Sequence, residues 1–190
     1  MSLFGKKYIR EERLAEDIRK GRSSAMKELY DTWSGYLLAL CRRYVPETAA
    51  AEDILQESFI KIFASAGTFV YKGPGSLKAW MSRIAVNEAL QYLRQSKRYG
   101  FVTTSDSLPE TAEDEEIDNI GDIPSEVIQQ MITELPDGYR TVFNLVVFED
   151  MSHKEIGEIM GISDRTSASQ YHRARKILAE KIRNYEKGLD

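Results

Sequence analysis

An acidic segment divides this chain into two parts. Residues 101–124 contain eight Asp or Glu and no Lys or Arg, together with Thr, Ser, Pro and Gly and little apolar periodicity. This composition is typical of a solvated linker. Residues 1–100 hold 17 basic against 11 acidic side chains, a net charge of +6, and residues 125–190 hold 9 against 11, a net charge of −2. We therefore expect a domain over residues 1–100, a flexible acidic linker over residues 101–123 and a second domain over residues 124–190.

On both sides of the linker, apolar residues recur at steps of three and four, the spacing of one face of an α-helix. Helices are predicted over residues 8–20, 23–45, 48–66 and 76–97 in the first domain, and over residues 125–135, 136–149, 153–161 and 163–185 in the second. No segment needs a β-strand. The sequence thus predicts an all-α protein made of two small helical domains.

The last two predicted helices have the layout of a helix-turn-helix, with Gly161 at the corner of the turn. Ser152 and Glu155 match the S-x-x-E capping box that starts a helix, and Ser163 is placed to cap the next one. Gly157 is a small residue at the point where two steeply crossing helices must approach closely. A plain helical hairpin would show the same layout, so the layout favours DNA binding without deciding it.

The surface of the last helix adds support for DNA binding. The residues expected on its buried side are Ser167, Tyr171, Ala174, Leu178, Ile182 and Tyr185. The residues expected to face outward are Arg165, Ser169, Gln170, Arg173 and Lys176, which are types that hydrogen-bond phosphates and base edges. Between Arg165 and Lys187 seven basic residues stand against two acidic ones, a local net charge of +5. An ordinary solvated helix would also show part of this pattern.

Several classes of protein are disfavoured. The longest nearly unbroken apolar run has 7 residues, and the N-terminus lacks a secretory signal, so we expect a cytoplasmic protein that spans no bilayer. Cys41 is the only cysteine and lies on an apolar helical stripe, which favours a buried structural role. His153 and His172 are expected at the surface. We find no pattern of catalytic residues, and we expect no enzyme activity, cofactor, metal or small-molecule substrate.

Two polar faces distinguish the first domain. On the helix from residue 48, one face carries Asp53, Gln56, Glu57, Ile60 and Lys61. Taken alone, this face is typical of a solvated surface. On the helix from residue 76, basic and amide residues recur at steps of four, four, three and four, and we call this face the basic stripe. It consists of Arg83, Asn87, Gln91, Arg94 and Arg98. From Lys72 to Arg98 six basic residues stand against Glu88 alone, which suits a helix lying along phosphates.

These segments resemble a known family. The stretch LPDGYRTVFNLVVFEDMSHKEIGEIMGIS is similar to region four of the sigma factors of bacterial RNA polymerase. The stretch AEDILQESFIKIF resembles the D-x-x-Q-E-x-F helix of region two. The stretch SLKAWMSRIAVNEALQYLRQSKR resembles the helix that follows it in the extracytoplasmic-function (ECF) subgroup of the sigma-70 family. Both domains match in the same order, over about four-fifths of the chain.

The resemblance implies a non-catalytic DNA-binding subunit that directs core RNA polymerase to specific promoters for transcription initiation. Asp53, Gln56 and Glu57 match the motif that grips the clamp coiled coil of the largest subunit, and Ile60 and Lys61 extend the same face. The basic stripe and the loop before it would open the minus-ten element and hold an extruded base. The residues implied there are Phe69, Tyr71, Lys72, Arg83, Asn87, Gln91, Arg94 and Arg98. For Phe69 and Tyr71 a place in the core is at least as well supported, and Trp80 is assigned to the core.

In the same way, region four would dock on the polymerase flap and on the minus-35 element. The residues implied to contact this DNA are Ser163, Arg165, Thr166, Ser169, Gln170, Arg173 and Lys176. The linker would run through the polymerase cleft, although an idle acidic tether would have the same composition. An anti-sigma factor that holds the protein inactive is a further implied partner.

Two points leave alternatives open. The last helix, which would be the recognition helix, departs from the family pattern at Ser167, Ala168 and Gln170. Related helices commonly carry a β-branched apolar residue, a lysine and an arginine at these positions, in that order. We expect Ser167 to bond the carbonyl one turn back. A helix-turn-helix regulator with a ligand-sensing or dimerising first domain is the alternative function, and the two polar faces of the first domain favour the sigma factor over it.

Overall fold

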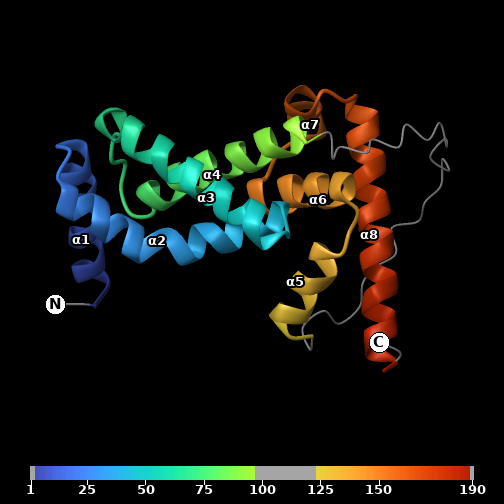
Figure 1. Cartoon of the computed structure of the whole chain (residues 1–190). Coiled ribbons are helices and arrows are strands. Elements are labelled where there is room, and N and C mark those ends of the chain that lie inside the picture. The colour runs from blue at the N-terminus through green and yellow to red at the C-terminus, as the bar shows by residue number, and fades with distance from the viewer. Residues whose placement is uncertain (1–2, 97–122, 189–190) are drawn as a thin grey trace. The chain divides into compact units, whose positions relative to one another are not determined.

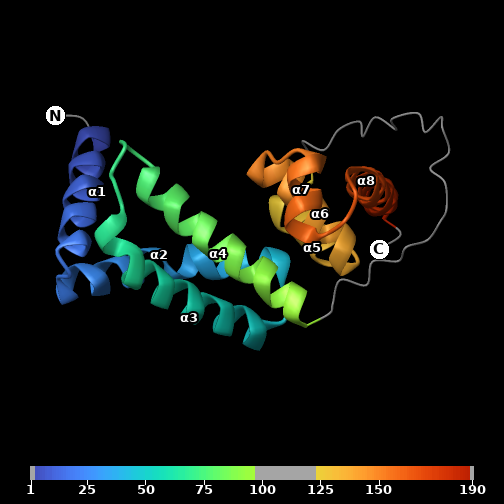
Figure 2. The same ribbon diagram turned by 90° about the horizontal axis from the view of Figure 1, so that it is seen from above.

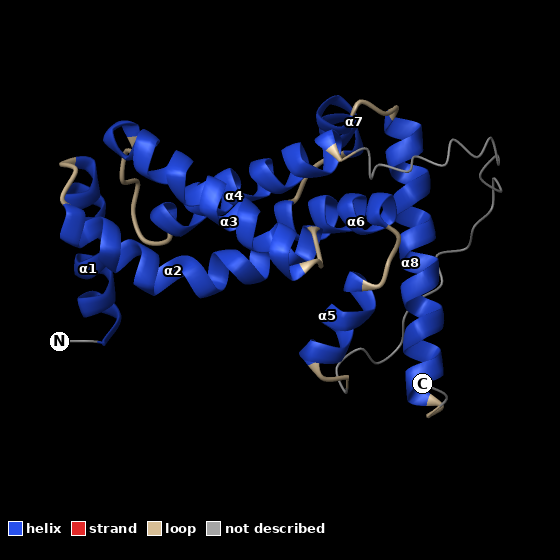
Figure 3. Ribbon diagram, in the orientation of Figure 1, coloured by secondary structure: helices blue, strands red, loops and turns tan. Residues whose placement is uncertain are grey.

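The computed structural model describes residues 3–96 and 123–188, with the backbone alone for residues 3–10. Nearly all of the predicted acidic linker, and Arg98 of the basic stripe, lie outside these residues. Within the described parts every regular element is a helix and there is no strand, as Figure 3 shows. The all-α prediction is therefore confirmed. The chain forms two compact units, Met1–Tyr92 and Leu93–Asp190, which are described separately below.

The N-terminal unit contains four α-helices and a short 3₁₀-helix (Figure 1). They are α1 (Leu3–Arg19), α2 (Ser23–Tyr44), α3 (Thr48–Ser65), η1 (Ala66–Thr68) and α4 (Ser76–Gln95), the last turn of which extends past the unit boundary. The predicted helices begin within a few residues of the observed ones, except that α1 starts five residues before the predicted position 8.

The core of this unit comes from the apolar stripes that the spacing predicts. Leu29 and Leu37 of α2, Ile62 of α3, and Leu77 and Met81 of α4 are all fully buried. Burying a side chain of this size stabilises the fold by about 1.5–3 kcal/mol. Because these stripes face inward, the polar sides of α3 and α4 are left at the surface.

The C-terminal unit contains α5 (Ser125–Thr133), α6 (Asp137–Glu149), α7 (His153–Met160) and α8 (Asp164–Glu186). Its core cluster joins Ala174, Leu178 and Ile182 of α8 to Met131 and Ile132 of α5. Helix α8 also packs along α6 and α7. The remaining length and surface of α8 are thus available for other contacts.

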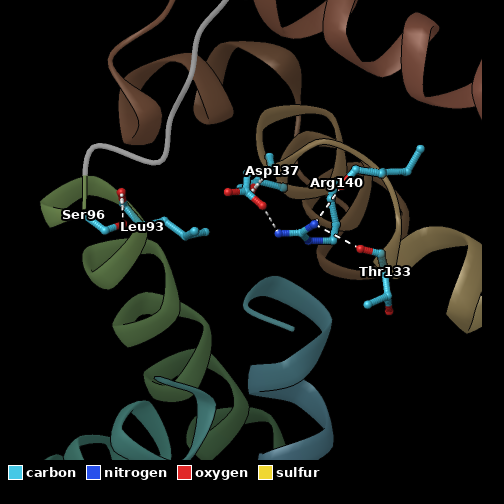
Figure 4. Close-up of polar contacts among 7 residues, drawn as sticks. Leu93, Ser96, Thr133, Asp137 and Arg140 are labelled. Atoms are coloured by element: carbon cyan, nitrogen blue, oxygen red, sulfur yellow. Dashed lines mark hydrogen bonds and ion pairs between the residues drawn. The ribbon is translucent and has the colours of Figure 1, made fainter. Parts of the chain in front are cut away.

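A buried arginine ties α5 to α6 (Figure 4). The Arg140 side chain is only 4% exposed, and its Nη1 donates hydrogen bonds to the carbonyl oxygens of Thr133 at 3.1 Å and Leu135 at 2.7 Å. Its Nη2 donates to the Asp137 carboxylate in the first turn of α6. One guanidinium therefore binds the last carbonyl of α5, a carbonyl of the turn that follows it and a carboxylate that favours the start of α6. The sequence analysis did not identify this residue.

The helix-turn-helix has the local signals that were predicted for it. Ser152 and Glu155 form the reciprocal capping box at the start of α7, and Gly161 ends α7 with a left-handed φ of 69°. Ser163 accepts a hydrogen bond from the Thr166 backbone N–H as the cap of α8. At Gly157 a Cβ atom would lie 2.7 Å from the Ile162 carbonyl oxygen, so no larger residue fits between α7 and the turn.

Candidate functional site

The polar face of α3 lies open to solvent. Asp53, Gln56, Glu57 and Lys61 are exposed, and Ile60 is 60% exposed between them. The opposite side of the helix is buried through Ile54, Leu55, Ser58, Phe59 and Ile62. An exposed isoleucine side chain makes no favourable interaction with water. A polar surface with an apolar residue at its centre is typical of a protein interface.

One member of this face is tied to α4. Lys61 Nζ lies 2.6 Å from Glu88 Oε1, in an ion pair whose Glu88 side chain is only 11% exposed. The same Nζ lies 3.4 Å from Gln91 Oε1. Lys61 was expected on the face of α3 that binds the polymerase, and Gln91 was expected on the basic stripe of α4. The structure therefore brings these two predicted surfaces together. The pair also neutralises Glu88, the only acidic residue between Lys72 and Arg98.

The basic stripe of α4 is exposed over its described length. Arg83, Asn87, Gln91 and Arg94 are all solvent-exposed, while Leu77, Met81, Ala85 and Leu90 fill the core. Tyr36 of α2 flanks the start of this helix, with its hydroxyl 3.1 Å from Ser82 Oγ and its ring centroid 4.2 Å from Lys78 Nζ. The stripe therefore presents cations and amides to solvent on a helix that the core holds in place.

The loop before α4 divides its residues between core and surface. Phe69 is 7% exposed and packs on Trp80 with ring centroids 4.7 Å apart, so the structure places it in the core. Trp80, which was assigned to the core, is only half-buried. Tyr71 is half-buried and Lys72 is exposed, while Val70 is 66% exposed. Val70 is thus an exposed apolar residue that the sequence analysis missed.

The recognition helix α8 keeps most of its predicted outward face. Arg165 and Lys176 are exposed, and Ser169 and Arg173 are half-buried. Arg173 Nη1 lies 3.3 Å from the Tyr139 hydroxyl of α6, which orients its guanidinium. Ser163 and Thr166 hydrogen-bond to each other at 2.8 Å in the capped first turn. Tyr185, expected in the buried stripe, is 38% exposed because it lies in the last turn of the helix.

The outward position expected for Gln170 is wrong. Its side chain is only 5% exposed and lies against Gly138 at the start of α6, where the absence of a side chain leaves room for the amide. Its Oε1 has no hydrogen-bond partner within the described part of the chain. Gln170 is therefore removed from the row of residues that face outward on α8.

Ser167 has a different partner from the expected one. Its hydroxyl is fully buried and lies 3.0 Å from His153 Nδ1 at the start of α7, rather than bonding the carbonyl one turn back. The His153 ring is half-buried and lies 5.8 Å from the Tyr171 ring, so this histidine is not a free surface residue. The contact joins the two helices of the helix-turn-helix across their interface.

Comparison with known proteins identifies both units. Residues 29–99 match the family model for Sigma-70 region 2, and residues 125–178 match that for Sigma-70, region 4. Over 97% of its length the chain is 30% identical to the ECF RNA polymerase sigma factor SigW of Bacillus subtilis, all of which is covered. The chain belongs to the ECF group of sigma-70 factors. The sigma factor is also 30% identical, over 88% of its length and 91% of the relative, to the RNA polymerase sigma-H factor of Pseudomonas aeruginosa.

A solved structure of the sigma factor RpoE in complex with the anti-sigma factor NepR from Bartonella quintana aligns with a TM-score of 0.46 and 23% identity, covering 81% of this chain and 94% of that one.

Family membership settles the function in outline: the protein is an RNA polymerase sigma factor that directs the core enzyme to promoters for transcription initiation. Sigma factors are DNA-binding initiation factors without catalytic activity of their own. The alternative of a ligand-sensing regulator does not account for the match of the first unit to region 2.

The described residues of the sigma factor contain neither a membrane-spanning helix nor a metal-binding cluster. Within residues 3–96 and 123–188, no helix is long and apolar enough to cross a membrane. In the same residues, no group of three or more His, Cys, Asp or Glu side chains is placed to hold a metal ion.

Proposed function

We propose that the sigma factor divides its work among three surfaces. The exposed face of α3 binds the clamp coiled coil of the largest polymerase subunit. The basic stripe of α4 and the loop before it bind and open the minus-ten element. Helix α8 binds the minus-35 element while its domain docks on the polymerase flap. The observation that carries the proposal is the α3 face, where Ile60 is 60% exposed among polar residues that all face solvent.

Replacing Asp53, Gln56 and Glu57 together by alanine tests the polymerase surface. All three side chains are exposed, so the variant should fold normally and lose most of its affinity for core polymerase. The matched control replaces Glu12 and Glu16, which removes the same number of carboxylates from exposed positions of another helix, α1. Titration of labelled sigma factor with purified core enzyme measures the affinity. Unchanged affinity of the triple variant would show that α3 is not the interface.

The minus-ten surface is tested at Asn87. Its amide is exposed at the centre of the basic stripe, and an amide can read the edge of an unpaired base. Asn87→Ala should leave core binding intact and lower the fraction of promoters that open, measured by permanganate reactivity of unpaired thymines. Glu52→Ala, an exposed change on α3 outside the proposed motif, is the control. Equal opening by the Asn87 variant and the wild-type protein would argue against this assignment.

The minus-35 surface is tested at Arg165 and Lys176, the two cations of the proposed set that are exposed. Alanine at either position should weaken promoter binding by the holoenzyme, because each loses a contact to a phosphate or a base. Gln170→Ala should leave promoter binding nearly unchanged, because the side chain is buried. Electrophoretic mobility shifts of a promoter fragment compare the three variants.

Membership of the family supports two further proposals, on location and on a regulatory partner. We propose that the protein acts in the cytoplasm, where its polymerase works, and that an anti-sigma factor holds it inactive. Capture of a partner from cells by the tagged sigma factor, followed by loss of run-off transcription when that partner is added back, tests the second proposal. A captured protein that does not inhibit transcription is not an anti-sigma factor.

A further inference from the structure

A carboxylate from α1 caps the start of α4. Glu11 accepts hydrogen bonds from the Gly75 backbone N–H on both oxygens, at 3.1 and 3.0 Å, and from the Leu77 N–H at 3.2 Å. The first N–H groups of a helix have no partner within the helix, and negative charge is favoured there. Here the cap comes from a residue 64 positions earlier in the chain.

The loop cannot supply this cap from its own residues. The Ser76 hydroxyl donates to the Gly73 carbonyl at 2.6 Å and accepts from the Lys72 N–H at 3.2 Å, so it closes the turn instead of capping the helix. Gly73 and Gly75 adopt φ angles of 114° and 83°, a region open mainly to glycine. Pro74 and the hydrogen bonds of Ser76 stiffen the turn itself, whereas the contact with Glu11 holds this turn in place beside α1.

Glu11 and Phe69 hold the loop at its two ends. Phe69 packs on Trp80 with ring centroids 4.7 Å apart, and Glu11 binds the other end through Gly75. Figures 1 and 2 both show the segment between η1 and α4 running beside α1. Between these anchors Val70 and Lys72 remain exposed. The loop is thus held at its ends while its middle faces solvent.

We infer that Glu11 is a positioning residue for minus-ten recognition: it contacts no DNA, and it holds the loop in the shape that receives the extruded base. The inference rests on the proposed function of that loop. It assigns part of promoter opening to α1, a helix outside the segment that matches region 2.

The test uses holoenzyme formed from core polymerase and Glu11→Ala, Glu11→Gln or wild-type sigma factor. The probe is the single-stranded non-template minus-ten segment of a promoter found by run-off transcription, intact or with one abasic site at each position in turn. With wild-type protein, the abasic site at the extruded position should weaken binding. Glu11→Ala should bind the intact strand about tenfold more weakly and lose nothing further at that position. Glu11→Gln keeps one acceptor oxygen and should recover part of the affinity.

Glu12→Ala is the matched control, since Glu12 is an exposed carboxylate on the next position of α1 and should behave as wild type. A Glu11→Ala variant that retains the wild-type penalty at the abasic position overturns the inference, whether its overall affinity is reduced or not. Wild-type protein that is indifferent to every abasic site overturns the proposed function of the loop itself.

Hydrogen exchange of the free protein adds a direct readout: the Gly75 and Leu77 amides should exchange faster in Glu11→Ala, while core amides of α2 are unchanged. Unchanged exchange at both amides also contradicts the inference.

Discussion

Gly157 sets how closely α7 can approach the turn that leads to α8. Any Cβ atom there would lie 2.7 Å from the Ile162 carbonyl oxygen, and backbone cannot move aside as a flexible side chain can. We expect Gly157→Ala to destabilise the C-terminal unit by about 1–3 kcal/mol, measured by urea unfolding. Gly35→Ala in α2 is the control, because nothing lies within 4 Å of its added Cβ. That substitution should stabilise the protein by about 0.5–1 kcal/mol, as helix propensity requires. Equal effects of the two variants would contradict the packing argument.

Cys41 should be chemically silent in the folded protein. Burial raises the pKa of its thiol to about 12, so almost no thiolate exists at neutral pH. Because the thiolate is the reactive form, a thiol reagent should modify Cys41 only as the N-terminal unit unfolds. Labelling should be complete in denaturant and slow without it, as followed by mass spectrometry. Labelling of the native protein at the rate of a free thiol would show that the site is open.

At the level of single residues, local patterns predicted the structure well and contacts across helices escaped prediction. The caps at Ser152 and Ser163 depend on neighbours three residues away, so their residues could be identified from spacing alone. Gln170 was misplaced because its position depends on the space beside Gly138, which helical periodicity does not describe. The partners Lys61 and Glu88 lie 27 residues apart and meet only once α3 and α4 are packed.

Among the helices, α7 has an end that should respond to acid. The hydrogen bond from the Ser152 hydroxyl, followed by the bond from the Ser152 N–H, lowers the pKa of Glu155 below its ordinary value of 4.5. A lowered pKa means that the contribution to stability is present above the ordinary value and is lost as the pH falls through the folded-state pKa. Glu155→Gln should therefore flatten the loss of stability in acid, measured by thermal unfolding from neutral pH downward. Glu158→Gln, an exposed change on the same helix, should leave the slope unchanged.

The junction of α5 and α6 depends on one guanidinium. Arg140→Met keeps much of the side-chain volume but leaves the Thr133 and Leu135 carbonyl oxygens without these donors. We expect a loss of about 1–3 kcal/mol in the unfolding free energy. Asp137→Asn should cost less, because the Asp137 side chain is 34% exposed and water can replace part of the contact. A larger effect at Asp137 than at Arg140 would show that the ion pair, rather than the carbonyl contacts, holds the junction.

For the whole molecule, the distribution of charge predicts weak DNA binding by the free protein. The net charge is −4, although α4 and α8 each carry a positive stretch, because residues 101–124 contribute −8. We expect free sigma factor to bind promoter DNA weakly and with strong salt dependence, and holoenzyme to bind specifically, as measured by fluorescence anisotropy at two salt concentrations. Replacing the eight carboxylates by Asn and Gln should tighten binding by the free protein. Tight, sequence-specific binding by the unmodified free protein would contradict this account.

The fit of Gln170 against Gly138 also bears on how such a protein can change its targets. A Cβ atom at position 138 would lie 3.3 Å from the Gln170 Oε1 atom, which the flexible amide accommodates by a small shift, whereas a larger side chain would occupy the space that the amide now fills. On the proposed docking of α8, this displaced amide would become an additional reader of the upstream element. A single change on a neighbouring helix could then retune which genes are switched on, with the reading helix itself left unaltered.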